Sequence, residues 1–356
     1  MDPAWFQVRV RVQRTINMKD NLVTGDIGLA HGSGGRKTGR LIKDLFLKHL
    51  GNPIANRMED AAELPAQGTR IALTTDSHVV QPLFFPGGDI GRLSICGTCN
   101  DLAVKGAKPR FITAGFILRA GLRAETLEKI IISMAEELHK ANVLLVAGDT
   151  KVIETGEVEE CYITTAGFGV LEHNSTFAPE RIEAGDKVIV SGTIGDHEAA
   201  VLLSRQDFGF EHHIKSDVAN IWPLVSALID AEIDIKAMRD PTRGGLATTL
   251  NELSTACGKA VLIKEGHVPF SSEVKAAAEM LGLDLYYLAS EGRLLAIVNE
   301  KDAEKAVEIL QAYPQARDAA IIGEVHDDGQ GLWLETLLGS QRPLLILEGE
   351  QLPRIC

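Results

Sequence analysis

Aspartates recur in this sequence beside glycines and threonines, at predicted strand ends or in Gly-rich turns. Five stand in such surroundings: Asp60, Asp76, Asp101, Asp149 and Asp240. An aspartate at a turn is often only a local cap for the backbone. Carboxylate oxygens are also ligands that Mg²⁺ prefers, and Mg²⁺ keeps substrate phosphates in its coordination shell. Together the five aspartates favour a magnesium–nucleotide site between folded layers, and therefore an ATP-using enzyme.

A second reactive group stands in the last residues of the sequence, where Pro353, Arg354 and Ile355 precede Cys356. The proline keeps the backbone extended, and the preceding residues 348–351 are polar and include a glycine. Chain ends of this composition are usually mobile, so the thiol of Cys356 is expected on a tether. The alternative is a frayed end with an incidental cysteine, because soluble proteins tend to avoid exposed free thiols.

Glycines are concentrated in HGSGGRK, residues 31–37, directly before an amphipathic helical pattern. Glycines ahead of a helix can bring backbone N–H groups close to a phosphate. The stretch is not a Walker A loop, because His31 and Arg36 stand where that motif needs glycine. A phosphate cradle that includes Gly34 and Gly35 and a merely flexible turn therefore both remain open.

Cys96 and Cys99 form a C-x-x-C pair inside a helical pattern over residues 90–103. A redox pair or a zinc site is one interpretation, but zinc would need a second cysteine pair. Both cysteines fit the apolar positions of the pattern, which favours small thiols in the core. The five cysteines are an odd number, and without an export signal they indicate free thiols in a reducing cytosol.

Bulk composition narrows the class of protein. The 356 residues are 45% hydrophobic and 24% charged, as in ordinary globular proteins. The net charge of -13 disfavours nucleic acid and anionic membranes as partners, because both need basic patches. No apolar run reaches transmembrane length, and the N-terminus lacks the apolar core of a signal peptide. We therefore expect a cytoplasmic protein.

Strand and helix patterns alternate along the chain, which predicts an α/β (α+β) fold, and the length favours two domains. Residues 71–75 are expected to form a strand that ends on Asp76, and residues 143–147 a buried strand followed by the polar GDTK. Residues 173–179 are the best linker candidate. A second set of strands and helices begins with the strand predicted at 187–190.

Six ordered motifs resemble the HypE family of hydrogenase maturation proteins: HGSGGR (31–36), TTDSHVVQPLFFPGGDIG (74–91), GTCNDLAVKGAKP (97–109), GDTKV (148–152), DPTRGGL (240–246) and PRIC (353–356). This family is part of the superfamily of aminoimidazole ribonucleotide synthetase, selenophosphate synthetase and thiamine-phosphate kinase. The resemblance covers residues 26–356. It implies a two-domain aminoimidazole-ribonucleotide-synthetase-like fold and a homodimer formed through β-structure of the N-terminal domains.

The implied domain organisation has four parts. Residues 1–25 are an N-terminal extension, 26–172 an ATP-binding and dimerisation domain, 173–340 a C-terminal α/β domain, and 341–356 a flexible tail. The resemblance places ATP and Mg²⁺ in the groove between the domains. The implied metal ligands are Asp60, Asp76, Asp101 and Asp240. The implied nucleotide-site residues are Gly34, Gly35, Asn100, Asp149 and Thr150.

The chemistry that the resemblance implies uses the thiol of Cys356. A carbamoyltransferase, HypF, would place a carboxamide on its sulfur, and ATP-dependent dehydration would leave a thiocyanate. The cyanide would pass to iron on a HypC–HypD scaffold for the [NiFe] hydrogenase centre. Candidate roles are Glu291 as base, Lys151 as phosphate or imidate ligand, and His31 as an orienting group. Two alternatives remain: a small-molecule kinase or synthetase of the same superfamily, and a non-catalytic assembly scaffold.

Overall fold

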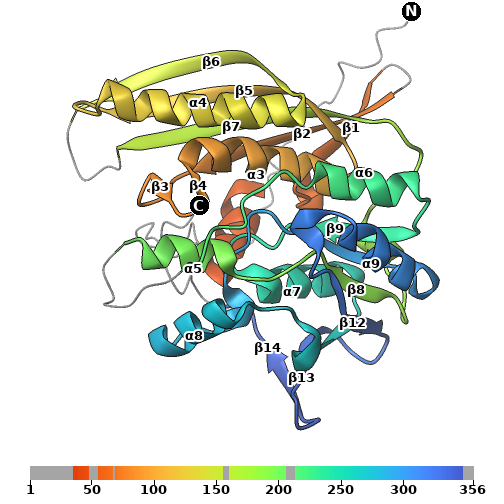
Figure 1. Cartoon of the computed structure of the whole chain (residues 1–356). Helices are drawn as coiled ribbons and strands as arrows, with labels where there is room; N and C mark the ends of the chain where they lie inside the picture. Colours follow the sequence, from red (N-terminus) through yellow and green to blue (C-terminus); the bar gives the residue numbers. More distant parts are fainter. Residues whose placement is uncertain (1–34, 48–54, 67–68, 155–159, 206–212, 348–356) are drawn as a thin grey trace, which may run out of the picture.

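The computed structural model describes residues 35–47, 55–66, 69–154, 160–205 and 213–347. The predicted site residues His31, Gly34 and Cys356, and the extension 1–25, lie outside these ranges. The described chain forms two large sheets with helices packed against them (Figure 1). Within the described ranges no helix is long and apolar enough to cross a bilayer.

The first sheet has five strands in the order β1-β2-β7-β5-β6. Its strands are β1 (Ala62–Ala66), β2 (Thr69–His78), β5 (Lys108–Arg119), β6 (Leu144–Ile153) and β7 (Cys161–Leu171). All neighbours are antiparallel except β5 and β6, which are parallel and joined through α4 (Ala124–Ala141). A parallel pair needs such a crossover. A small hairpin of β3 (Phe84–Phe85) and β4 (Gly88–Asp89) precedes α3 (Ile90–Val104).

One face of this sheet is covered and the other is open. Residues of β7 alternate between buried and more exposed positions, as expected for a sheet with one packed face. Helices α3 and α4 lie along the packed face (Figure 1). The open face carries exposed hydrophobic side chains on β2 and β5, among them Leu73, Phe111 and Ile117. Such a patch is typical of an interaction surface.

The strand predicted at 143–147 is present, but the prediction that it is buried is wrong. β6 runs from Leu144 to Ile153, and every residue except the last is exposed. Leu144 is 64% exposed and Val152 is 67% exposed. The reason is position: β6 is the edge strand, and a short apolar run does not tell an edge from a centre. The polar residues 148–151 lie within the strand and do not cap it.

The second sheet has seven strands in the order β14-β13-β10-β12-β8-β11-β9. These are β8 (Lys187–Val190), β9 (Ile235–Arg239), β10 (Ala260–Lys264), β11 (Leu295–Val298), β12 (Ala320–His326), β13 (Gly331–Glu335) and β14 (Gln341–Leu344). Its helices are α5 (Asp196–Leu203), α6 (Trp222–Asp230), α7 (Gly245–Cys257), α8 (Ser272–Leu281) and α9 (Ala303–Gln311). Val188 and Val190 of β8 share a core with α7, whereas Ile189 between them packs with α6 and α9. This sheet is therefore covered on both faces.

The start of the tail differs from the sequence-based boundary at 341. Residues 341–344 form β14, which pairs antiparallel with β13, and the side chain of Leu344 is buried. Beyond β14 the backbone is still fixed. Tyr287 donates a hydrogen bond to the carbonyl of Leu345 (2.7 Å), and the backbone N–H of Arg36, at the start of α1 (Arg36–Leu41), donates to Leu347 (2.9 Å).

Helix α3 is the central element. Thirteen of its fifteen residues are buried, and it packs against the first sheet as well as against α6 of the second half. Asp89 caps its first turn by accepting from the N–H groups of Gly91 and Arg92. Cys96 and Cys99 lie within it at 0% exposure, and burial raises the pKa of Cys99 to about 12. The interpretation of these cysteines as core thiols is confirmed.

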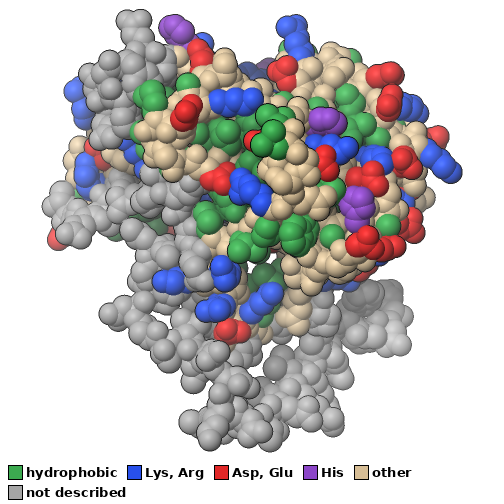
Figure 2. Space-filling view, turned by 90° about the horizontal axis from the view of Figure 1, so that it is seen from below, with side chains coloured by type: hydrophobic (Ala, Val, Ile, Leu, Met, Phe, Trp, Pro, Cys, Tyr) green, Lys and Arg blue, Asp and Glu red, His purple; other side chains and the backbone are tan. Residues whose placement is uncertain are grey.

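The surface seen from below carries basic and acidic side chains that are intermixed, with hydrophobic ones between them (Figure 2). The β13–β14 hairpin lies at this end of the molecule (Figure 1). Its turn exposes Leu337 and Leu338.

Candidate active site

Four predicted aspartates from both halves of the chain come together around α3. Asp60 precedes β1, Asp76 lies in β2, Asp101 in α3, and Asp240 directly follows β9. Burial raises the pKa of Asp101 well above its usual value, and the negative charges of Asp240, Asp76 and Asp60 add to the shift. Burial and the charge of Asp60 raise the pKa of Asp240 to about 7. The aspartates are therefore close enough to repel one another.

Neighbouring polar groups hold these carboxylates in place. The hydroxyl of Thr74 lies 2.7 Å from Asp101 Oδ2 and 2.9 Å from the carbonyl oxygen of Asp60. The side chain of Asp60 forms an ion pair with Arg239. Asp76 Oδ2 is 3.4 Å from Nε2 of the buried His78. Burial lowers the pKa of His78, and the carboxylate of Asp76 opposes that shift.

The cluster fits a cation that is shared with phosphates better than a closed protein cage. Among the residues that the structure describes, no three His, Cys, Asp or Glu side chains form a group that could hold a metal by themselves. Mg²⁺ commonly takes one or two carboxylates and completes its shell with water and phosphate oxygens. Burial raises the pKa values of Asp101 and Asp240, and the like charges around them raise these values further. A divalent cation would relieve that repulsion.

Glu291 lies at the same place. It is 3% exposed, and its Oε1 atom has no hydrogen-bond partner among the described residues. Burial raises the pKa of Glu291 well above its usual value, the charges of Asp240 and Asp76 raise it further, and Arg243 opposes them. A buried carboxyl group with a raised pKa beside a charged cluster is a candidate general base.

The glycines of DPTRGG explain how Asp240 and Arg243 reach this cluster. Gly244 and Gly245 have φ values of +78° and +59°, which favour glycine. A Cβ on Gly245 would stand 2.6 Å from the backbone carbon of Tyr287. The chain therefore turns sharply and enters α7 against the backbone of η7 (Leu285–Tyr287).

Asp149, Thr150 and Lys151 are not brought to the aspartate cluster within one chain. They lie on β6, three strands away from β2, or roughly 14 Å at the usual strand spacing. Asp149 is aligned with Gly115 of β5, on the open face of the sheet. Lys151 Nζ is 2.8 Å from Asp149 Oδ2, and both side chains are exposed. Hydrogen bonds from Lys151 and from the backbone of Thr150 lower the pKa of Asp149.

Asn100 and Gly35 are the remaining described members of the predicted nucleotide site. Asn100 is fully buried, and its amide binds backbone groups of the second half of the chain. Gly35 directly precedes α1, and its carbonyl accepts from the N–H of Gly39. Their roles toward a nucleotide stay predictions.

Sequence reasoning missed four residues that the structure places at the site: His78, Asp217, Arg239 and Arg243. Three of them stand inside or beside the quoted motifs, so the signal was available for His78, Arg239 and Arg243. Asp217 stands in no motif. Its role follows only from a contact with Glu291, 74 residues away in the sequence.

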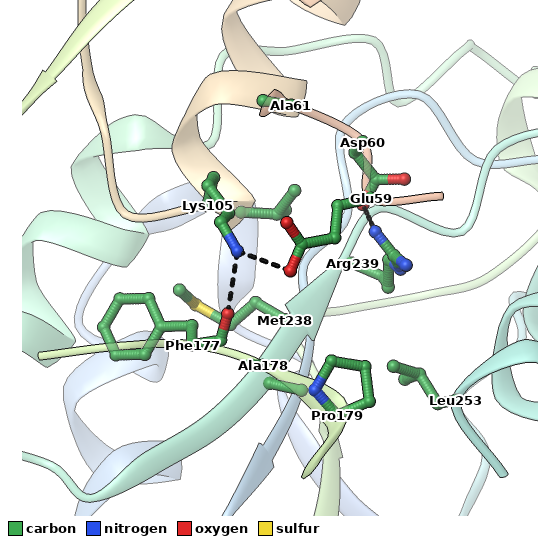
Figure 3. Close-up of a pocket in the computed structure, with 12 residues that line it drawn as sticks. Glu59, Asp60, Ala61, Lys105, Phe177, Ala178, Pro179, Met238, Arg239 and Leu253 are labelled. Atoms are coloured by element: carbon green, nitrogen blue, oxygen red, sulfur yellow. Dashed lines mark hydrogen bonds and ion pairs between the residues drawn. The ribbon is translucent and has the colours of Figure 1, made fainter. Parts of the chain in front are cut away.

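The cavity beside Asp60 is too small for a nucleotide. It has a volume of about 20 Å³, room for roughly one water molecule. Figure 3 shows the ion pairs on its two sides, Lys105 with Glu59 (2.7 Å) and Arg239 with Asp60. This cavity therefore does not hold a nucleotide.

The sequence of this chain is similar to known protein families and proteins over most of its length. The model of the AIR synthase related protein N-terminal domain matches residues 58–171, and that of the C-terminal domain matches residues 183–333. Carbamoyl dehydratase HypE of Azotobacter vinelandii is 44% identical over 337 residues, which cover 94% of this chain and 99% of that protein.

Two solved structures are similar over most of the chain. The crystal structure of a HypE–HypF complex has a TM-score of 0.82 and 44% identity, and covers 86% of this chain and 99% of that one. A structure of HypE in complex with ATP has a TM-score of 0.78 and 42% identity, and covers 92% and 99%. The fold is thus that of the AIR synthase related proteins. Within that class, the chain belongs to the HypE family, as the six motifs predicted.

Proposed function

We propose that this protein catalyses the ATP-dependent dehydration of an S-carboxamide to a thiocyanate during hydrogenase maturation, which supplies the cyanide ligand of the [NiFe] centre's iron. The proposal is carried by the similarity to carbamoyl dehydratases over nearly the whole chain. It is supported by Glu291, a buried residue beside the aspartate cluster whose Oε1 atom has no hydrogen-bond partner among the described residues. The resemblance to a HypE structure with bound ATP supports ATP as the phosphate donor.

The reaction balances as two steps. The carboxamide oxygen attacks the γ-phosphorus of ATP, the bond from that phosphorus to the bridging oxygen breaks, and ADP leaves as one N–H proton is lost. Loss of the second N–H proton then expels the oxygen as phosphate and forms the C≡N bond. The net reaction converts the carboxamide and ATP to thiocyanate, ADP and phosphate. The elements of water that the carboxamide loses appear in the products of ATP hydrolysis.

Glu291 is the proposed base. A base is most effective when its pKa lies near the working pH, and burial moves the pKa of this carboxyl group upward, toward that range. The guanidinium of Arg243 acts in the opposite direction and favours the ionised carboxylate. Exclusion of water around Glu291 strengthens its electrostatic interactions and protects the reactive phosphorylated amide from hydrolysis.

Mg²⁺ would be held by four aspartates: Asp60, Asp76, Asp101 and Asp240. When bound, it would neutralise negative charge on the phosphates. The repulsion among their carboxylates is what a cation would offset. Gly34 and Gly35 are proposed to contact phosphate, and His31 to orient the phosphate or the carboxamide. Asp149 and Thr150 remain candidates for nucleotide contacts, and Lys151 for the phosphate or imidate oxygen.

Cys356 is the proposed carrier of the carboxamide. The last described residues before it are held by Tyr287 and by Arg36, whose Nε also donates to the carbonyl of Ile346 (3.2 Å). Nine residues follow Leu347, and a chain of that length spans at most about 30 Å. The proposal requires that this segment bring the thiol to Glu291 and also to a separate carbamoyltransferase.

A homodimer would cover the open face of the first sheet. The exposed hydrophobic side chains of that face, including Leu73, Phe111 and Ile117, would be buried by a second copy. Asp149 and Lys151, which point to that face, would then lie at the interface between the copies. HypF is the proposed carbamoyl donor, since a similar protein was solved as a HypE–HypF complex. A HypC–HypD scaffold is the proposed cyanide acceptor.

The test is intact-mass measurement after incubation with a carbamoyltransferase, carbamoyl phosphate and Mg–ATP. We expect a carboxamide-sized gain followed by loss of one water. Cys356→Ala should show neither change, and Glu291→Gln should gain the carboxamide but retain the water. A partner that is shown active and yet leaves the mass unchanged would refute the proposal and favour a small-molecule kinase of the same fold. Docking without any ATP-dependent change would favour a scaffold.

A further inference from the structure

The peptide backbone at Glu291 is held from both sides by polar side chains. Its N–H donates to Oδ1 of Asp217 (3.0 Å), and its carbonyl oxygen accepts from Nδ2 of Asn100 (3.0 Å). Asn100 comes from α3, whereas Asp217 comes from the segment ahead of α6. We propose that Asn100 and Asp217 are positioning residues that aim the carboxyl group of Glu291 at the reacting amide. This proposal rests on the function proposed above.

Asn100 has no amide hydrogen left for a nucleotide in this arrangement. Its two N–H groups donate to the carbonyl oxygens of Ala219 and Glu291, both at 3.0 Å. Its amide oxygen accepts from the N–H of Ile221 at 3.0 Å, and the residue is 0% exposed. An asparagine amide carries two donor hydrogens, so binding a ligand would require breaking one of these buried bonds. Asn100 therefore acts on the protein itself.

Asp217 is fixed as firmly from the other side. Its side chain is 1% exposed, and its Oδ2 lies 3.2 Å from Nε of Arg293. Arg293 is held in turn by the carbonyl oxygens of Thr193 (2.8 Å) and Gln315 (2.7 Å). The Asp217 carboxylate thus forms an ion pair with a fixed guanidinium, although its Oδ2 makes no hydrogen bond within the described residues.

Close packing leaves the Glu291 peptide little room to rotate. A Cβ on Gly292 would stand 1.9 Å from the carbonyl oxygen of Asp217 and 2.8 Å from the nitrogen of Ala219. Only glycine allows the two segments to approach so closely. Within the described residues, Oε1 of Glu291 makes no hydrogen bond. Asn100 and Asp217 therefore fix the backbone from which this carboxyl group extends.

The first experiment separates positioning from nucleotide binding. Asn100→Ala should lower the rate of water loss from the carboxamide-bearing protein about 10- to 100-fold, because small misplacements of a reacting group have costs of this size. The ATP concentration for half-maximal rate should stay within about 2-fold of wild type. A raised ATP requirement with an unchanged maximal rate would instead identify a nucleotide contact and overturn the proposal. If Asn100→Ala does not fold, the isosteric Asn100→Asp serves, since it can accept from Ile221 but cannot donate to either carbonyl.

The second experiment uses rescue and a matched control. Asp217→Asn keeps an oxygen that can accept from the Glu291 N–H and should retain most activity, whereas Asp217→Ala should lose it. Asp186→Ala removes another buried carboxylate that accepts a backbone N–H, that of Glu183 at 2.7 Å, away from the site. Its folded fraction should turn over like wild type. Equal losses of activity in all three variants would show that Asp217 has only a general structural role.

A double-mutant cycle completes the test. If Asn100 acts through Glu291, adding Asn100→Ala to Glu291→Gln should cause no further loss of the residual rate. Multiplied losses would show that Asn100 acts elsewhere. The proposed function fails differently: either the wild type loses no water with ATP, or Glu291→Gln is as fast as wild type.

Discussion

Asp240→Asn should stabilise the folded protein at neutral pH. A carboxyl group whose folded pKa is about 7, against an ordinary 3.8, is harder to ionise in the folded state than in the unfolded state. At about 1.36 kcal/mol per pKa unit, the shift corresponds to about 4 kcal/mol. Burial is the first cause and the charge of Asp60 the second. The asparagine removes both penalties while it keeps the shape.

The sign of the pH dependence follows from linkage. Between pH 4 and 7 the unfolded state has lost the Asp240 proton and the folded state has kept it, so the free energy of unfolding falls as pH rises. The penalty is absent below pH 4 and complete above pH 7. The advantage of Asp240→Asn should therefore be small at pH 4 and approach about 4 kcal/mol at pH 8.

The assay is urea unfolding without nucleotide or divalent cation, at pH 4, 6 and 8. Asp149→Asn is the control, because this aspartate is exposed and its pKa is lowered by Lys151, not raised. Addition of Mg²⁺ should reduce the difference in the free energy of unfolding between wild type and Asp240→Asn at pH 8. A gain in stability that is the same at all three pH values would refute the electrostatic argument.

Three further predictions concern other parts of the molecule. Ile117→Asp should shift the protein from dimer to monomer in sedimentation analysis, because it puts a charge on the open apolar face; an unchanged mass would remove that face from the dimer proposal. Tyr287→Phe should slow water loss about 3- to 10-fold with folding retained, since it deletes one hydrogen bond, to the Leu345 carbonyl, of about 1 kcal/mol; an unaltered rate would separate this contact from tail placement. Cys96 and Cys99 should resist iodoacetamide at pH 8 in the folded protein, because burial raises the pKa of both thiols, and peptide mapping that finds them modified would contradict their assignment to the core.

The residue types and local motifs were enough to select most of the aspartates that the structure brings together. Asp76, Asp101 and Asp240 could be selected from the sequence because each stands in a motif where polar residues interrupt an apolar pattern. The structure gathers them, although Asp76 and Asp101 lie inside a strand and a helix and not in turns. The alternation of strands and helices likewise predicted two α/β halves.

Long-range partners could not be predicted in this way. Arg239 binds Asp60 across 179 residues of sequence, and Asp217 binds Glu291 across 74. Nothing in local periodicity encodes such a pairing, because it depends on how two sheets pack around α3. The exposure of β6 escaped prediction for a related reason. Its apolar side chains resemble those of a central strand, and only its place at the sheet edge distinguishes it.

The burial of Asn100 between the two halves has a consequence for how the enzyme moves. Three side chains join the N-terminal half to the C-terminal half. Lys105 donates to the carbonyl of Phe177, Arg239 pairs with Asp60, and Asn100 donates to two carbonyl groups. Opening a hinge between the halves would strand these buried groups, each at a cost of about 1–3 kcal/mol. We therefore expect the bodies of the protein to stay locked together through the catalytic cycle. Delivery of the substrate would then require no hinge motion between the halves.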